Sequence, residues 1–426
     1  MAALNYLFHP VMSRMLRVEE FGEVQALISL TYITGVILTV YKTSIVHLSS
    51  QDDDQDVQAA QVRGDVMPRI TALTLYAIGI FSLGLLVLRP MLMDSLQLTS
   101  AHSLYVLIAM LFVGVPFMFY SSYLQGKKAF GVVSVSNIIL AASKIVIAVG
   151  LVLLGLSVFG AVVSLVLSTM AGLSYVYYHA RGRVRFRPTL AVWWDQALGR
   201  ELSYSFLILC SLGFVMFFFT SDVLVVKYFF SPEEAGLYSG IATIARIIFF
   251  ATASISAVLL PTIRLRASAQ DNMQILRKAC MFIGGLGLVA LGGFFFFGEL
   301  IIGLLIGSEY VVYVHLLPLV GVYIFLISLI NVFYTYFLAL RDRRIIGSSL
   351  IGIIVLLYLV AVRHETVRQI VENYTISGVL VLLLLLVSLY LAPPQRGDKL
   401  GTRGKKGKYV FETLKRRACI PSKKVE

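Results

Sequence analysis

Long apolar runs separated by short polar connections make up nearly the whole chain. Runs of about 20 apolar residues recur from the N-terminus to residue 392, and each is long enough to cross a bilayer as a helix. The pattern predicts an all-α integral membrane protein with about 12 transmembrane helices. We expect these helices at 1–17, 24–48, 68–89, 101–125, 129–155, 157–179, 202–230, 234–263, 275–305, 310–340, 343–363 and 372–392.

Two short motifs recur at a constant distance along the chain. Val-Glu-Glu-Phe-Gly at 18–22 is similar to Pro-Glu-Glu-Ala-Gly at 232–236, and Tyr-Leu-Gln-Gly-Lys-Lys at 123–128 aligns with Phe-Leu-Ala-Leu-Arg-Asp at 337–342. Both pairs are 214 positions apart, which is about half of the 426 residues. The similarity predicts two related six-helix halves, the usual plan of a transporter that handles its substrate between them.

The helix pattern divides the chain into four parts. A first half at 1–179 is followed by a basic cytoplasmic linker at 180–201, a second half at 202–392 and a basic tail at 393–426. The Trp pair at 193–194 favours an interfacial helix within the linker. The tail has too few apolar residues to fold alone, so we expect it to be disordered and to lie on anionic lipid.

Composition and charge add the orientation. Hydrophobic residues are 58% of the chain and charged residues 14%. The net charge of +13 could suggest nucleic acid, but its distribution follows membrane topology instead. With both termini in the cytoplasm, 27 of the 36 Lys and Arg residues lie on the inner side of a cell membrane and five on the outer side. Positive charge stays inside, so this orientation is favoured and no nucleic-acid partner is expected.

Four segments carry a resemblance to a known family. The first contains Asn-Tyr-Leu-Phe at 5–8, Ser-Arg-Met-Leu at 13–16 and Glu-Glu-Phe-Gly at 19–22. The second contains Ser-Asp-Val-Leu at 221–224 and Ser-Pro-Glu-Glu-Ala-Gly-Leu-Tyr at 231–238 and ends at Pro261. The third is Gly-Ser-Glu-Tyr at 307–310, and the fourth is Gly-Leu-Ser-Val-Phe-Gly at 155–160. With these segments, residues 1–392 resemble the polysaccharide (oligosaccharide) flippase family of the multidrug/oligosaccharidyl-lipid/polysaccharide (MOP) exporter superfamily. Two features depart from the family: the first helix is shorter, and the connection 363–373 lacks a glycine-rich turn.

The resemblance implies a function. Such proteins move a lipid-linked glycan, usually on a polyprenyl diphosphate, from the inner to the outer leaflet. A polar cavity between the halves would accept the sugar head, whose hydroxyl groups a bilayer would leave without hydrogen bonds. Nothing is changed covalently, so we expect no catalytic residues, no cofactor and no enzymatic activity. The expected partners are the lipid-linked glycan, membrane lipids and glycosyltransferases of the same pathway.

Three cations inside predicted helices are candidate substrate-binding residues. An ionisable group at the centre of a membrane helix costs about 2.5–3.5 kcal/mol on insertion scales, so each needs a reason. Lys144 lies midway along its helix and suits a diphosphate or an acidic sugar, although helix carbonyl groups could also hold it. Arg246 is a second candidate for the cavity. Lys42 lies near an inner helix end, where snorkelling to the headgroups explains it equally well.

Two carboxylates are candidates for ion coupling or gating. Asp222 and Arg246 lie at similar depth on consecutive helices, so they could form an ion pair. That pair could be structural, could break and re-form between conformations, or could make Asp222 a proton site. Glu299, in the outer half of its helix, could carry a proton or cap a short segment. Lys227 lies near the outer surface and could snorkel there.

Other classes of protein fit the sequence less well. The acidic run at 52–56 could hold Mg²⁺ in an enzyme, but such enzymes generally need a second acidic cluster, and the sequence contains none. A solvated acidic loop is therefore favoured. The six His and three Cys residues show no metal-ligand spacing, so we predict no metal site. A multidrug-type antiporter of the same superfamily is an alternative, although the buried cations suit an anionic cargo. A glycan polymerase or ligase would need a larger outer loop.

Overall fold

The computed structural model describes residues 2–50, 57–189, 195–263 and 269–391, and these form a helical bundle without β-strands. Ten helical stretches of this part of the chain are long and apolar enough to cross a membrane. One of them, 130–180, contains two helices, and the first helix of the chain is additional but has only 14 residues. The predicted all-α membrane fold with about 12 helices is therefore confirmed.

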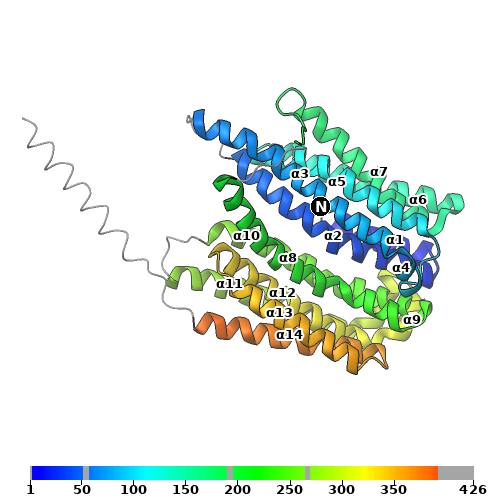
Figure 1. Cartoon of the computed structure of the whole chain (residues 1–426). Helices are drawn as coiled ribbons and strands as arrows, with labels where there is room; N and C mark the ends of the chain where they lie inside the picture. The colour runs from blue at the N-terminus through cyan, green and yellow to red at the C-terminus, as the bar shows by residue number, and fades with distance from the viewer. Residues whose placement is uncertain (1, 51–56, 190–194, 264–268, 392–426) are drawn as a thin grey trace, which may run out of the picture.

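The first half of the bundle runs from blue to green-cyan in Figure 1. Its elements are α1 (Ala2–Met15), α2 (Val18–Ser50), α3 (Val57–Val87), α4 (Arg89–Ser95), α5 (Ala101–Gly126), α6 (Phe130–Leu151), the π-helical turn η2 (Val152–Leu156) and α7 (Ser157–Ala180). The helices α5, α6 and α7 pack closely on one another, and α2 packs on α5. Gly155 has a φ of 85°, a conformation that favours glycine, and it turns the chain from α6 into α7.

The second half runs from green to orange and lies beside the first (Figure 1). Its elements are α8 (Gln196–Phe229), α9 (Pro232–Ala245), α10 (Ile247–Thr262), α11 (Ala269–Leu305), the 3-10 helix η3 (Ser308–Leu316), α12 (Leu317–Ala339), α13 (Arg344–Val362) and α14 (Val367–Tyr390). The helix α2 packs against both α8 and α9 and forms the main contact between the halves.

The two halves share one plan in the structure. The helices α2 and α9 begin at 18 and 232, and α6 and α13 begin at 130 and 344, so each pair keeps the offset of 214 residues. The bundle end with the α8–α9 and α13–α14 turns is here called the predicted outer end, at the right of Figure 1. The opposite end, with the α5–α6 turn, is called the predicted inner end.

Several helices begin earlier than expected. The helices α3, α8, α11 and α14 start 11, six, six and five residues before the predicted starts, at 57, 196, 269 and 367. Their first turns are polar, and hydropathy alone excludes such turns although the backbone continues as a helix. The short α4 was not predicted. The expected helix 234–263 is interrupted at Arg246, between α9 and α10. The acidic run 52–56, the Trp pair 193–194 and the tail lie outside the described residues.

The two glycines of the repeated motif meet at the predicted outer end. A Cβ atom on Gly22 of α2 would lie 2.8 Å from the Cα atom of Gly236 of α9, and a Cβ atom on Gly236 would collide with the Val18 carbonyl oxygen. We call this contact the glycine seam. Close by, Ser13 donates a hydrogen bond to the Ile306 carbonyl oxygen at 3.1 Å. The motif that revealed the repeat is therefore the place where the halves touch through their backbones.

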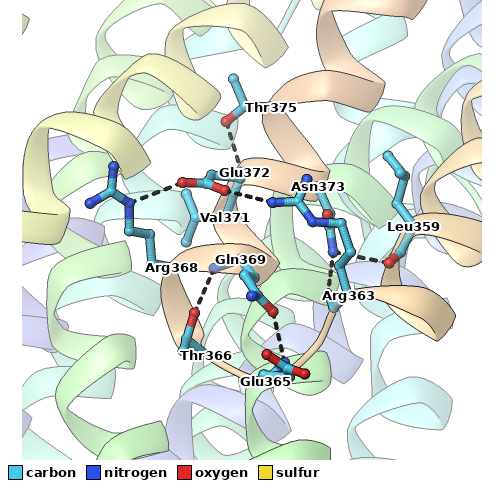
Figure 2. Close-up of polar contacts among 10 residues, drawn as sticks. All are labelled: Leu359, Arg363, Glu365, Thr366, Arg368, Gln369, Val371, Glu372, Asn373 and Thr375. Atoms are coloured by element: carbon cyan, nitrogen blue, oxygen red, sulfur yellow. Dashed lines mark hydrogen bonds and ion pairs between the residues drawn. The ribbon is translucent and has the colours of Figure 1, made fainter.

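The α13–α14 turn is built by side chains rather than by glycine (Figure 2). Asn373 donates to the carbonyl oxygens of Leu359 and Arg363 at 3.2 and 2.7 Å. Glu372 accepts from Arg363 at 3.2 Å and from Arg368 at 2.9 Å. The Asn373 bonds satisfy carbonyl groups at the end of α13, and the Glu372 contacts tie the turn to the start of α14. These contacts explain how the connection turns without glycine.

Candidate functional site

A cavity of about 490 Å³ lies within the first half of the bundle. Side chains of α1, α2, α5, α6 and α7 form its walls, and Phe250 of α10 lines it from the second half. Most of the lining is apolar or aromatic, and a few polar side chains project among them. The volume falls within the range of about 300–1,000 Å³ that is usual for ligand pockets.

Lys144 is the cation of this cavity. It lies on α6, and its Nζ donates to Asn5 Oδ1 at 3.0 Å and stands 4.8 Å from the centre of the Phe8 ring. Asn5 and Phe8 both belong to α1, so the lysine ties the short first helix to α6. Among the described residues, no carboxylate forms an ion pair with Lys144. No carboxylate of the described chain therefore neutralises the Lys144 side chain.

Polar groups of α1 continue from this cavity towards the second half. Buried His9 lines the cavity, and its Nδ1 lies 2.8 Å from Gln25 Nε2 of α2. The hydroxyl group of Tyr6 has no hydrogen-bond partner in the described part of the chain. A small adjoining cavity is lined by Tyr6, His9, Tyr32, Thr243, Arg246 and Phe250. The two cavities thus bring Lys144 and Arg246 to one polar wall, which Tyr6 and His9 share.

Asp222 and Arg246 form a buried ion pair between α8 and the α9–α10 break. Arg246 Nη2 lies 2.8 Å from Asp222 Oδ1, and the Tyr238 hydroxyl donates to Asp222 Oδ2 at 2.7 Å. Both partners of the pair are almost fully buried. The guanidinium also lies over the ring of Phe219, 5.2 Å from its centre. The ion pair expected from the sequence is present, and each carboxylate oxygen has one partner.

Further tyrosines surround this pair. The Tyr374 hydroxyl lies 2.8 Å from Ser221 Oγ, and the Tyr323 ring packs edge-on against Tyr374. Within the described residues, the Tyr323 hydroxyl and Arg246 Nε have no hydrogen-bond partner. Buried polar groups rarely stay unpaired, so this region has capacity for a further ligand atom or a water molecule. The sequence pattern does not single out Tyr323 or Tyr374, because each occupies a position within an apolar helix.

The other candidates lie apart from both cavities. Lys42 is half-buried on α2 and lines neither of them. Glu299 is exposed on α11, just beyond a kink at Phe297. Lys227 is 1% exposed, so the expectation that it snorkels to the surface is wrong. It is buried in the same outer part of the bundle as Glu23 of α2, which accepts from the backbone and side chain of Thr99.

Metal-binding chemistry has no evident place in the described residues, since they contain no group of three or more His, Cys, Asp or Glu side chains that could hold an ion. The polar groups that line the cavities are instead amide, hydroxyl and imidazole groups together with two cations. Such a set can bind an anionic or hydroxyl-rich ligand.

Comparisons with known proteins agree with this architecture. An inward-facing multidrug resistance MATE family transporter of the MOP superfamily is 13% identical with a TM-score of 0.68, and the match covers 92% of this chain and 95% of that one. The inward closed conformation of the lipid II flippase MurJ is 12% identical with a TM-score of 0.64, over 92% and 86%. The eukaryotic MATE transporter AtDTX14 is 15% identical with a TM-score of 0.63, over 93% and 95%.

These likenesses show a shared fold. No curated protein sequence matches the chain. The model of one family, described as polysaccharide biosynthesis protein, matches residues 1–265, which is more than half of the chain. The chain therefore belongs to the polysaccharide biosynthesis protein family, and it has the fold of the MOP superfamily.

Proposed function

We propose that this protein moves a lipid-linked oligosaccharide from the inner to the outer leaflet of the cell membrane, with both termini in the cytoplasm. The observation that carries the proposal is the Lys144 cavity, a mostly apolar and aromatic space with one cation in a protein of this family. A diphosphate-linked sugar head has an anionic part and ring faces that aromatic walls accept. The lipid tail would remain in the bilayer.

Lys144 and Arg246 are the residues that we propose to meet the anionic part of the cargo. Both reach the wall formed by Tyr6 and His9, and neither the Tyr6 hydroxyl nor Arg246 Nε has a partner within the described chain. A phosphate oxygen bound there would complete these hydrogen bonds. Lys42 lines neither cavity, so we assign it no contact with the cargo.

The glycine seam supports alternating access between the halves. Backbone contact between α2 and α9 closes the predicted outer end, so release on that side requires the seam to part. The Asp222–Arg246 pair spans the helix break within the second half, and cargo that attracts Arg246 would compete with Asp222 for it. We propose that this competition links binding to gating. Glu299 is exposed on α11 and lines neither cavity, so we assign it no part in this competition.

A multidrug-type antiporter is the second candidate, since two of the similar structures are MATE transporters. The cations at the cavity favour an anionic cargo over the organic cations that a multidrug antiporter would carry. Neither function changes a covalent bond, so neither assigns a catalytic residue.

The test is a deletion strain whose lipid-linked glycans are profiled and assigned to a leaflet. Complete units should accumulate on the inner leaflet and clear on re-expression. Lys144→Ala should lose this clearing activity, because the cavity then lacks its cation, while Lys144→Arg should retain part of it. Lys42→Ala serves as the matched control and should clear normally. An unchanged glycan profile together with altered drug tolerance would favour the antiporter.

A further inference from the structure

A second pocket, of about 480 Å³, opens at the predicted outer end of the second half. It lies where the end of α8, the start of α9, the end of η3 and the α13–α14 turn meet. Unlike the Lys144 cavity, it combines aromatic rings with acidic side chains. The lining side chains that matter most are Phe229, Glu234, Tyr313, His315, His364 and Glu365.

One wall of this outer pocket is held in place before any ligand arrives. The contacts of Asn373 and Glu372 shown in Figure 2 fix the α13–α14 turn. Gln369 accepts from the Glu365 backbone nitrogen at 2.9 Å, and the His364 ring stacks on Phe229 at 4.4 Å between ring centres. A preformed wall lowers the entropy cost of binding, because the side chains need not be ordered by the ligand.

Several polar atoms of the outer pocket remain available. In the described part of the chain, neither the Glu365 carboxylate nor the His315 ring has a hydrogen-bond or ion-pair partner. His364 uses Nδ1 towards the Val360 carbonyl oxygen, which leaves Nε2 free. Glu234 uses Oε2 to cap α9 at Ser231, which leaves Oε1 free. The free groups are thus mainly acceptors.

The charge of this pocket selects against an anion. Glu234 and Glu365 contribute negative charge to the lining, and Arg368, which also lines the pocket, is paired with Glu372 at 2.9 Å. Sugar hydroxyl groups donate hydrogen bonds to carboxylates and imidazoles, and aromatic rings pack on the apolar faces of sugar rings. Uncharged sugar units therefore match the pocket, whereas a diphosphate does not.

The position of the pocket connects it with transport. Glu234 lies half a turn before Gly236, so the pocket adjoins the glycine seam that must part for release. We propose that the outer pocket binds uncharged sugar units of the oligosaccharide head as it leaves the protein. This assignment rests on the proposed function and adds a second, chemically distinct subsite to the cavity of Lys144.

The test uses purified protein in nanodiscs and a panel of free neutral oligosaccharides of hexoses and N-acetylhexosamines, followed by saturation-transfer NMR. At least one should bind saturably. Tyr313→Ala and His364→Ala should each weaken its Kd by about tenfold, which is about 1.4 kcal/mol. Tyr358→Ala and His102→Ala are the matched controls, since neither residue lines the pocket. Inorganic diphosphate should not displace the oligosaccharide.

Glu365→Gln keeps the test decisive if the other variants unfold, because Glu365 is exposed and its side chain supports no neighbour. It should weaken the Kd several-fold in a folded protein. The assignment fails if no oligosaccharide of the panel binds, if Glu365→Gln binds as well as the wild type, or if diphosphate competes. Failure of the transport proposal looks different: the deletion strain would then accumulate no inner-leaflet glycan, whatever binds outside.

Discussion

The two halves of the bundle follow one helical plan, yet the first half contains a cavity at a position where the second half contains a buried ion pair. With the offset of 214 residues, Phe8 beside the first-half cavity corresponds to Asp222, and Tyr32 of the same cavity corresponds to Arg246. The first half thus places aromatic rings around a space, and the second half places an ion pair and a tyrosine hydroxyl there. Lys144 corresponds to Tyr358, which is exposed on α13.

This difference separates two uses of a buried charge. Asp222 and Arg246 form an ion pair, whereas among the described residues the Lys144 ammonium group donates to one neutral amide, that of Asn5. A paired charge contributes to the stability of the fold only as long as both partners remain. A charge without an ionic partner instead attracts a ligand. On the proposed function, the first half supplies a cation that has no carboxylate partner, whereas the cation of the second half is held by an ion pair until cargo competes for it.

The largest change in stability is expected when one member of the ion pair is removed. Asp222→Ala should lower the free energy of unfolding by about 3–5 kcal/mol, because Arg246 is left charged and buried. Thermal unfolding of the purified protein measures the loss. The double variant Asp222→Leu with Arg246→Met should recover most of it. If the double variant is as unstable as the single one, the pair is not what holds the second half together.

A smaller effect is expected at the glycine seam. Gly236→Ala should destabilise by about 1–3 kcal/mol, because its Cβ atom meets the backbone of α2 and both helices must shift. Gly35→Ala is the matched control within α2, since nothing lies within 4 Å of a Cβ atom there. The control should gain up to about 1 kcal/mol from helix propensity. Equal unfolding temperatures for the two variants would contradict a tight seam.

The sequence predicted the depth of each residue in the membrane better than the side of the helix on which that residue lies. Hydropathy and the repeated motif predicted the helices, the two halves and the meeting of Asp222 with Arg246, since these depend on position along the chain. Position along the helix favoured Lys144 over Lys42, which lies near an inner helix end, but it could not show which of Lys144, Lys42 and Glu299 faces a cavity. Which of them faces a cavity depends on how neighbouring helices pack.

The residues of α1 were missed for the same reason. Asn5, Tyr6 and His9 form a polar wall only because the short α1 packs against α6 and α2. In the sequence they are three polar positions within a short helix. Because α1 and α6 are far apart in the chain, no signal in the sequence places these residues beside Lys144. The contacts of the α13–α14 turn were not predicted either, because Asn373 donates to backbone carbonyl groups and the pairing of Glu372 with Arg363 depends on how the turn folds.

The smallest change in stability is expected at the turns that connect helices at the predicted outer end, which the two halves build in different ways. The first half relies on Gly155 at positive φ between α6 and α7, and the second relies on Asn373 donating to two carbonyl groups of α13 (Figure 2). Asn373→Ala should cost about 1–2 kcal/mol, because buried carbonyl groups lose their donor. Arg368→Ala should cost less than about 1 kcal/mol, because its ion pair with Glu372 is exposed.

Thermal unfolding of the two variants side by side measures this difference, and Gly155→Ala extends it to the first half. That change should cost about 1 kcal/mol through backbone strain alone, since nothing lies near a Cβ atom at Gly155. A larger loss for Arg368→Ala than for Asn373→Ala would mean that surface charge, not the amide, holds the second turn. In that case stability should also fall with added salt, which screens exposed ion pairs but leaves a buried amide hydrogen bond unchanged.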